Sequence, residues 1–261
     1  MVFRFIDSGK IDPFLNMAID EAISISVREG KSPPTIRFYE WDGPALTVGE
    51  FQRIEEININ FCNLQGIPIV RRPTGGKGIL HLEDLTYSIS SRKEGVFSDS
   101  LFRTYEIIAK IFVNAFNLQG ITTEIKKEKR VVNRTSLCFA RSSFGEICYR
   151  DIKILGSAQK RWKEGFLQQG TMPIFVNKAL LKEVFLLKDE ELSSVFGIKE
   201  IFPDFDIMGF KNSFKLSLIK EGFDIIEDSL RQDELLIAKK LLLEKYKNSY
   251  WTYKQNGSFK D

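Results

Sequence analysis

One cysteine and one lysine have the residue types needed for covalent acyl chemistry. Cys138 begins the run CFARSSFGEICYRD, and Lys153 follows fifteen residues later, just after a predicted turn at Arg150-Asp151. A thiol acts as a nucleophile only as a thiolate, which a nearby cation favours by lowering the thiol pKa. The two side chains could meet if the chain folds back at this turn, but the spacing alone favours two unrelated residues over a catalytic pair.

A second segment combines positive charge with exposed backbone. Residues 71–81 read RRPTGGKGILH and contain two arginines, three glycines and the only histidine of the chain. Glycines let backbone N–H groups approach a ligand closely, and guanidinium groups add charge beside them. The spacing of Gly75, Gly76 and Gly78 fits neither the P-loop nor the dinucleotide-binding fingerprint. The segment therefore predicts either a tight turn between strands or a binding loop. A single His81, without a nucleophile elbow, does not indicate a catalytic triad.

Composition excludes several classes of protein. The net charge of +3, from 38 basic and 35 acidic residues, is too small to indicate nucleic-acid or membrane binding. Neither a signal peptide nor an apolar run of membrane-spanning length is visible, so we expect a cytoplasmic protein. Three cysteines without a Cys-x-x-Cys spacing support neither a disulfide framework nor a zinc site. Cys62 and Cys148 are expected to be packing residues.

The elements that must position these residues predict an α+β protein, with a mixed or antiparallel sheet flanked by helices. Helices are expected from Pro13, capped by Asp12, to just before Gly30, and over Arg53 to Gln65, Asp99 to Gln119, the segment NKALLKEVF, and Asp228 to Lys247 in a helical remainder. Strands are expected at TIRFYEW, ALTVG, IPIVRR and DLTYSIS, followed by a three-stranded meander from Gly145 to Val176. The 22 phenylalanines favour an aromatic core, although they could also enclose an apolar ligand.

Together, the ordered motifs resemble the lipoate-protein ligase and octanoyltransferase superfamily. They read FRFIDSG, NMAIDEAI, PPTIRFYEW, GEFQ, RRPTGGKGILH, DLTYSI, CFARSSFGEI, KILGSAQKR and LQQGTMPI, and the likeness extends to KYKNSYWTYK. The most similar branch is the cysteine-dependent octanoyltransferases. The resemblance implies a catalytic domain similar to those of biotin- and lipoate-protein ligases. It also implies that residues 1–261 form a single acyltransferase domain without a separate C-terminal accessory domain.

The resemblance also implies roles for individual residues. Cys138, in the CF motif, would carry the acyl chain as a thioester, and Lys153, in the K-x-x-G-S-A-Q motif, would lower the pKa of that thiol. The glycine loop and a small-residue turn at Gly156-Ser157-Ala158 would form two walls of a narrow acyl slot. The acyl- or substrate-binding residues expected on this basis are Arg72, Thr74, Gly75, Gly76, Lys77, Gly78, His81, Gly156, Ser157 and Ala158. Arg71, Arg72 and Lys77 would steer acidic partners.

Two departures from the family pattern affect histidine chemistry. Leu82 stands where many relatives have Asp after the histidine, and Gln169 stands where many have His. These changes weaken any mechanism that depends on a histidine base, but they leave Cys138 and Lys153 untouched. The family likeness implies neither a cofactor nor a metal.

The implied reaction has two protein partners. The donor would be octanoyl-acyl-carrier protein, and the acceptor would be a lipoyl-domain protein such as the glycine-cleavage carrier or the E2 component of a 2-oxoacid dehydrogenase; neither nucleic acid nor membrane is implied. Three alternatives stay open. They are an amidotransferase that takes octanoyl from the glycine-cleavage carrier, an ATP-dependent lipoate-protein ligase, and an inert acyl- or carrier-binding regulator. The presence of Cys138 argues against the ligase.

Overall fold

The long strands of the chain gather into one mixed sheet. The structure is a computed structural model that describes residues 1–97, 100–126, 137–140 and 145–253. Among these residues, eight strands form a sheet in the order β11-β1-β2-β6-β10-β9-β8-β7. Their bounds are β1 Val2–Ile11, β2 Thr35–Trp41, β6 Glu83–Arg92, β7 Glu124–Ile125, β8 Ile147–Tyr149, β9 Ile152–Arg161, β10 Gly165–Phe175 and β11 Asp224–Glu227. Strand β1 pairs in parallel with β2 and β11, whereas the other neighbours are antiparallel. The predicted mixed sheet is confirmed.

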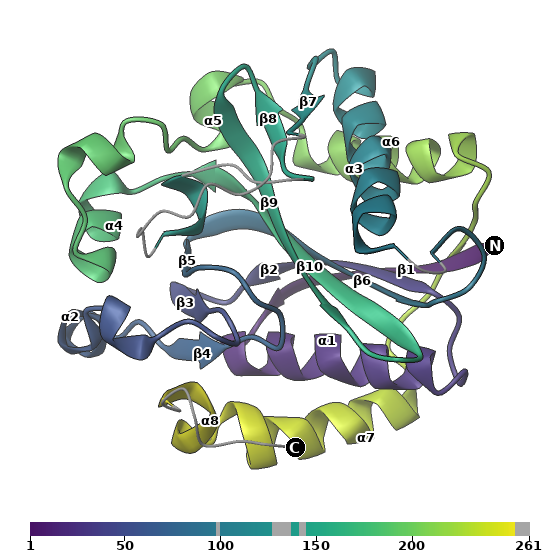
Figure 1. Cartoon of the computed structure of the whole chain (residues 1–261), viewed down its shortest axis with the longest axis horizontal. Helices are drawn as coiled ribbons and strands as arrows, with labels where there is room; N and C mark the ends of the chain where they lie inside the picture. The colour runs from purple at the N-terminus through teal and green to yellow at the C-terminus, as the bar shows by residue number, and fades with distance from the viewer. Residues whose placement is uncertain (98–99, 127–136, 141–144, 254–261) are drawn as a thin grey trace.

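Helices cover both faces of this sheet, as Figure 1 shows. One face packs against α1 (Pro13–Arg28), with α7 (Gln232–Leu241) beneath it, and the other packs against α3 (Leu101–Leu118) and α6 (Ile207–Lys220). Shorter helices are α2 Ile59–Leu64, α4 Lys178–Phe185, α5 Ile198–Ile201 and α8 Ser249–Tyr253. Single turns occupy Ile54–Glu56, Gly95–Phe97, Cys138–Ala140, Asp189–Leu192 and Leu242–Tyr246. The α+β class is confirmed, and no described helix has both the length and the apolar character needed to cross a membrane.

Phenylalanine is the commonest residue in the core between the sheet and α3 and α6. Phe38 of β2 meets Phe214 of α6 edge-to-face at 5.1 Å between ring centroids, and Phe214 also packs 4.6 Å from Phe112 of α3. Such offset and edge-to-face pairs are the favoured aromatic geometries. The phenylalanines of this cluster are Phe3, Phe5, Phe38, Phe97, Phe112, Phe116, Phe166, Phe205, Phe210, Phe214 and Phe223. The aromatic residues therefore serve mainly as core.

A small second sheet carries the arginine and glycine segment. Its order is β4-β3-β5, with β3 Ala45–Val48, β4 Ile69–Arg71 and β5 Ile79–His81. Helix α4 and residues Leu137 to Phe139 pack against this sheet in a shared apolar cluster. The glycine segment thus links β4 to β5, and the small sheet holds it next to Cys138.

Several predicted boundaries are corrected by tertiary contacts. The helix predicted over Arg53 to Gln65 is wrong as a single helix, because the backbone is extended at Ile57 and α2 begins only after Asn58. The Asn58 backbone N–H donates to Val184 O of α4 at 2.9 Å, and its side chain accepts a hydrogen bond from the Phe61 N–H at 3.1 Å. The contact with α4 therefore takes the N–H that a continuous helix would have used.

The C-terminal part is not entirely helical. Strand β11 pairs with β1, and the Asp228 N–H extends this ladder by donating to Phe5 O at 3.0 Å. Helix α7 consequently starts at Gln232 instead of Asp228. The start of helix α3 also differs from the prediction. Ser100 caps this helix, and the predicted first residue, Asp99, lies outside the described residues.

A buried ion pair joins α1 to the centre of the sheet. The side chains of Asp20 and Arg37 are fully buried, and Arg37 donates to Asp20 Oδ1 at 2.7 Å. Asp20 also accepts hydrogen bonds from Tyr39, Ser88 and Gln169 at 2.7 to 2.8 Å. Because every one of these groups lies away from water, each depends on the others for its hydrogen bonds.

We predict that Asp20→Ala lowers the free energy of unfolding by about 3 to 5 kcal/mol, because it leaves the Arg37 guanidinium buried without its counterion. Urea denaturation measures this change. The control Glu106→Ala breaks the exposed Arg103–Glu106 pair on α3 and is expected to change stability by less than about 1 kcal/mol. Equal losses in the two variants would contradict the structural role of the buried pair.

Candidate active site

The structure places the thiol of Cys138 beside the ammonium of Lys153. Lys153 Nζ lies 3.4 Å from Cys138 Sγ and donates a hydrogen bond to the Cys138 carbonyl oxygen at 2.8 Å. Lys153 is buried, with 3% of its surface exposed, whereas Cys138 is partly exposed. A cation at this distance stabilises the anionic form of the sulfur relative to the neutral thiol.

The β8-β9 hairpin brings Lys153 to this position. The turn includes Arg150, which adopts a left-handed φ of 52°, and the register then pairs Cys148 with Lys153. From β9 the lysine side chain passes over Gly156, where an added Cβ would lie 2.6 Å from Lys153 Cε and 2.9 Å from Nζ. Glycine at this position therefore leaves the space that the lysine side chain occupies.

A carboxylate completes the cluster. Glu146 Oε1 accepts a hydrogen bond from Lys153 Nζ at 2.6 Å, and Glu146 is 4% exposed. Burial by itself lowers the pKa of Lys153, but the charges of Cys138 and Glu146 outweigh it and raise the pKa above its ordinary value. Sequence reasoning missed Glu146, although it lies inside the motif CFARSSFGEI, because a single carboxylate near a turn resembles a surface residue.

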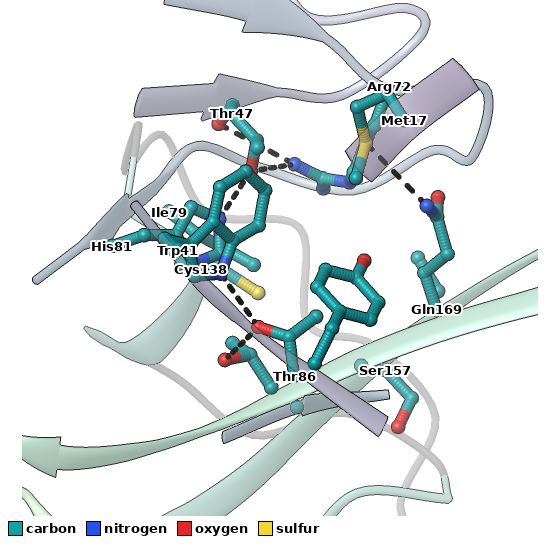
Figure 2. Close-up of a pocket in the computed structure, with 15 residues that line it drawn as sticks. Met17, Trp41, Thr47, Arg72, Ile79, His81, Thr86, Cys138, Ser157 and Gln169 are labelled. Atoms are coloured by element: carbon teal, nitrogen blue, oxygen red, sulfur yellow. Dashed lines mark hydrogen bonds between the residues drawn. The ribbon is translucent and has the colours of Figure 1, made fainter. Parts of the chain in front are cut away.

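The Cys138 sulfur faces a pocket whose empty space, including the part open to solvent, is about 360 Å³. Figure 2 shows Arg72, Gln169 and Ser157 around the same space. The remaining lining residues, most of which sequence reasoning missed, are Met17, Tyr39, Trp41, Thr47, Ile79, His81, Thr86, Gly156, Ala158, Gly170 and Thr171. None of these described lining residues is a phenylalanine. A narrow cavity with apolar walls and one nucleophile suits an extended hydrocarbon chain joined to a carbonyl group.

The glycine segment holds the cysteine and the arginine beside this pocket. The Cys138 backbone N–H donates to Gly78 O at 3.0 Å, and an added Cβ on Gly78 would meet a Phe185 ring carbon at 2.4 Å. Arg72 donates to the carbonyl oxygens of Gly75 and Lys77 at 2.6 and 2.9 Å. The segment is therefore a tight connection whose carbonyl groups face cationic and N–H donors.

Gly76 has a left-handed φ of 92°, and its added Cβ would lie 2.8 Å from Arg72 Nη2 and 3.7 Å from Ala158 Cβ. The glycine segment thus lies against the wall formed by Gly156, Ser157 and Ala158. These three residues belong to strand β9, so the predicted small-residue turn is wrong. They pair with β10 in regular antiparallel register, Gly156 with Thr171, Ser157 with Gly170 and Ala158 with Gln169.

The arginines are buried groups that bond the backbone, so their predicted role in steering partners cannot involve direct contact. Arg71 is fully buried and donates to backbone carbonyls of Gly49, Gln52 and Thr252 at 2.6 to 3.0 Å. Burial lowers the pKa of Arg72 to about 10, and the nearby Cys138 charge opposes this shift. Lys77, in turn, forms a 2.7 Å ion pair with Glu56. Both guanidinium groups are held against backbone carbonyls and are not exposed for direct contact with a partner.

His81 lies in the pocket wall as a fully partnered side chain. Its Nδ1 meets Asp84 Oδ2 at 2.5 Å, its Nε2 meets Thr47 Oγ1 at 2.9 Å, and its ring stacks on Trp41 with centroids 3.9 Å apart. Asp84 therefore supplies the acidic partner even though Leu82 follows the histidine. This environment fits a residue that orders the wall better than one that exchanges protons with a substrate.

The wall residue Gln169 connects the pocket to the buried ion pair and to Thr74 of the glycine segment. Thr74 donates to Gln169 Oε1 at 2.8 Å, and Gln169 Nε2 donates to Asp20 Oδ2 at 2.7 Å. On the opposite side, Ser157 Oγ lies 2.6 Å from Tyr87 OH. The sequence indicated Thr74 and Ser157, and Gln169 acts here as a neutral bridge where a histidine would be charged or neutral depending on pH.

The other two thiols lie in different environments. Cys62 and Cys148 are buried, and burial raises the pKa of Cys62 to about 11. Their predicted packing role is confirmed by this burial. Within the described residues, no group of three or more His, Cys, Asp and Glu side chains is placed to hold a metal ion.

Comparison with known proteins assigns a family and a fold. The model of the lipoyl protein ligase A/B catalytic domain matches residues 12–216. The chain is 35% identical to the octanoyltransferase LipM of Bacillus cereus, covering 96% of this chain and 98% of that protein. It is 33% identical to LipM of Bacillus subtilis, with 97% and 98% covered.

The solved structures that resemble this fold include lipoate-protein ligases. A lipoate-protein ligase A bound with ATP matches with a TM-score of 0.83 at 22% identity, covering 97% of this chain and 99% of the other. The bipartite lipoate protein ligase of Thermoplasma acidophilum, described with its E2 lipoyl domain, matches with a TM-score of 0.81 at 21% identity, covering 97% and 96%. At these identities the likeness concerns the fold.

We predict that Gly156→Ala displaces Lys153 Nζ and moves the pH profile of Cys138 alkylation by iodoacetamide to higher pH. Because the displaced ammonium is buried and ion-paired, the free energy of unfolding is also expected to fall, by about 1 to 3 kcal/mol. Alkylation is followed by peptide mass spectrometry across a pH series. The matched control is Gly165→Ala, whose Cβ would lie 2.4 Å from the Ser91 carbonyl oxygen. It should lower stability more and leave the alkylation profile in place. An unchanged profile in Gly156→Ala would show that the lysine keeps its position without this glycine.

Proposed function

Because this chain belongs to the lipoyl protein ligase A/B catalytic-domain family, we propose that it moves octanoyl from octanoyl-acyl-carrier protein to a lysine of a lipoyl-domain protein through a Cys138 thioester. It is an octanoyltransferase of lipoate biosynthesis, an activity supported by LipM relatives that match it over nearly their whole length. The observation that carries the proposed mechanism is the Cys138 thiol, which faces an apolar pocket 3.4 Å from a buried ammonium.

The first transfer loads the enzyme. The Cys138 thiolate attacks the carbonyl carbon of the donor thioester, a carbon–sulfur bond forms, and the pantetheine thiolate leaves and takes up a proton. Lys153 supports this step in both directions, because its ammonium stabilises negative charge on sulfur. One thioester replaces another, so the step is nearly balanced in free energy and needs no activation by ATP.

The second transfer unloads it. The neutral amine of the acceptor lysine attacks the thioester carbonyl, the new carbon–nitrogen bond forms, and the Cys138 thiolate leaves. The nitrogen loses one proton, which balances the proton taken up by the released pantetheine thiol. Because an amide is more stable than a thioester, this step drives the pair of reactions forward. The ammonium of Lys153 receives the departing thiolate.

The pocket can select the acyl chain by burial. Placing about seven apolar carbons against Met17, Trp41, Ile79 and their neighbours contributes ~0.8 kcal/mol per carbon, on the order of 5 kcal/mol in total. Much shorter acyl chains bury fewer carbons and therefore lose a large part of this binding free energy. The Cys138 thiol lies in the wall of the pocket, and apolar surface lies beyond it. This arrangement supports octanoyl transfer, because one site can both bind the acyl chain and react with its carbonyl group.

The C-terminal helices support the proposal that residues 1–261 act as one catalytic domain. Trp251 Nε1 of α8 donates to Arg71 O at 2.8 Å, and Arg71 Nε donates to Thr252 O at 3.0 Å. The strand that leads into the glycine segment is thus bonded directly to the last described helix. These contacts favour one folded unit over two.

The donor experiment tests the proposed function. The protein is mixed with apo-lipoyl domain and octanoyl-acyl-carrier protein, and the acceptor is weighed by intact mass spectrometry. We expect the mass of one octanoyl group to appear without ATP. A gain only with octanoylated glycine-cleavage carrier as donor would indicate an amidotransferase, and a gain only with octanoic acid and ATP would indicate a ligase; either result overturns the proposal. Donor binding without any covalent adduct would indicate a carrier-binding regulator.

Two variants test the residue roles. Cys138→Ser is expected to abolish acceptor modification, and Lys153→Ala to slow acylation by about 100-fold or more and to move alkylation of Cys138 to higher pH. The control Cys62→Ala removes a buried thiol in α2, outside the pocket, and should still form the thioester. An unchanged alkylation profile in Lys153→Ala would remove the lysine from its assigned role.

A further inference from the structure

We propose that Glu146 is a positioning residue that keeps Lys153 in its ammonium form while Cys138 carries the acyl chain, and thereby prevents the acyl chain from passing to Lys153 itself. The inference rests on the proposed function, because it assumes an acyl thioester on Cys138. It concerns a hazard that the site creates by placing an amine beside a thioester.

The charges around Lys153 explain the need for a second anion. In the free enzyme, the Lys153 ammonium lies between Cys138 Sγ at 3.4 Å and Glu146 Oε1 at 2.6 Å. Glu146 supplies the carboxylate that is ion-paired with Lys153 among the described residues, and both side chains are nearly removed from water. A buried ammonium keeps its proton only when nearby anions or acceptors offset its desolvation.

Acylation removes one of these two anions. The sulfur of a thioester is neutral, so Lys153 loses the Cys138 charge that helps to hold its proton. Burial lowers the pKa of Lys153, and the charges of Cys138 and Glu146 raise it. In the acyl-enzyme, the charge of Cys138 is gone, and of these two groups only Glu146 still raises the pKa of Lys153. The Cys138 carbonyl oxygen, at 2.8 Å, adds a neutral acceptor.

Within the described part of the chain, the other charged and titratable groups near the cluster do not replace Glu146. Arg72 interacts with the Cys138 charge and is itself cationic, so it cannot supply the negative charge that Lys153 needs. Tyr105, next to Gly145, has its pKa raised by burial, with smaller contributions from Tyr87, Glu146 and Cys138, and is therefore neutral at physiological pH. Among these described groups, Glu146 is the one that keeps a negative charge beside Lys153 once Cys138 is acylated.

Without that charge, Lys153 becomes a neutral amine beside an activated carbonyl. Its nitrogen can attack the thioester carbon, a carbon–nitrogen bond forms, and the carbon–sulfur bond breaks. The proton released by the nitrogen goes to the departing Cys138 thiolate. The products are a free thiol and an octanoyl amide on Lys153, which balance the reactants and require no other reagent. This transfer is downhill and removes the cation from the site, so the enzyme is inactivated.

The test compares Glu146→Gln with the wild type in the acyl-enzyme stage. Each protein is incubated with octanoyl-acyl-carrier protein in the absence of acceptor, treated with hydroxylamine, weighed intact and then mapped by peptide mass spectrometry. The wild type should carry a hydroxylamine-labile octanoyl group on Cys138. Glu146→Gln should accumulate a hydroxylamine-resistant octanoyl group on Lys153, and its turnover should decay on the order of 10-fold or more faster, because one opposite charge at this distance changes proton binding by at least that factor.

Two further variants keep the test decisive. Glu146→Asp retains the charge and should restore the labile adduct, which loss of folding alone would not predict. Glu146→Gln combined with Lys153→Arg retains a cation that cannot accept the acyl chain, so the resistant adduct should disappear. A Glu146→Gln protein that is folded by circular dichroism and carries only a labile Cys138 adduct overturns this inference while the proposed function stands. Failure of the wild type to form any Cys138 adduct would overturn the proposed function and this inference together.

Discussion

A buried ammonium is the constraint on which the arrangement of this site depends. Lys153 cannot lie almost wholly out of water unless acceptors surround its Nζ atom, and the structure supplies the Cys138 carbonyl, the Cys138 sulfur and the Glu146 carboxylate. The lysine lies on β9, and its acceptors come from two other parts of the chain, the single turn at Cys138 and the segment before β8. Three features bring these groups together. They are the β8-β9 hairpin, Gly156 next to the lysine side chain, and Gly78, whose carbonyl oxygen accepts a hydrogen bond from the Cys138 backbone N–H.

A second buried charge stabilises the opposite wall. Asp20 and Arg37 join α1 to the sheet, and Gln169 connects them to Thr74 at the start of the glycine segment. The pocket is therefore framed by two polar networks that are each satisfied internally, with apolar surface between them. Such an arrangement fixes the depth and width of a cavity more firmly than apolar packing alone, because a shift in one member leaves other buried groups unpaired.

The two arginines at the start of the glycine segment are buried and do not form an exposed positive surface. Two consecutive arginines in a glycine-rich segment suggest an anion-binding surface. In the structure, however, Arg71 and Arg72 donate hydrogen bonds to backbone carbonyl oxygens. These hydrogen bonds hold the backbone of the glycine segment and of the loop after β3 in place. Neither guanidinium is exposed for direct contact with an acidic partner.

The sequence by itself determined the mixed α+β class, the helix that begins at Pro13, and the β8-β9-β10 meander, because caps, turn residues and alternating apolar positions are local signals. The motif order indicated the family. Tertiary structure decided the rest: the break at Ile57, the strand β11, and the burial of the arginines depend on partners distant in the chain. Glu146 illustrates the reason most directly. Its local sequence is that of an ordinary acidic residue, and only the fold, by burying it 2.6 Å from Lys153, turns its charge into part of the site.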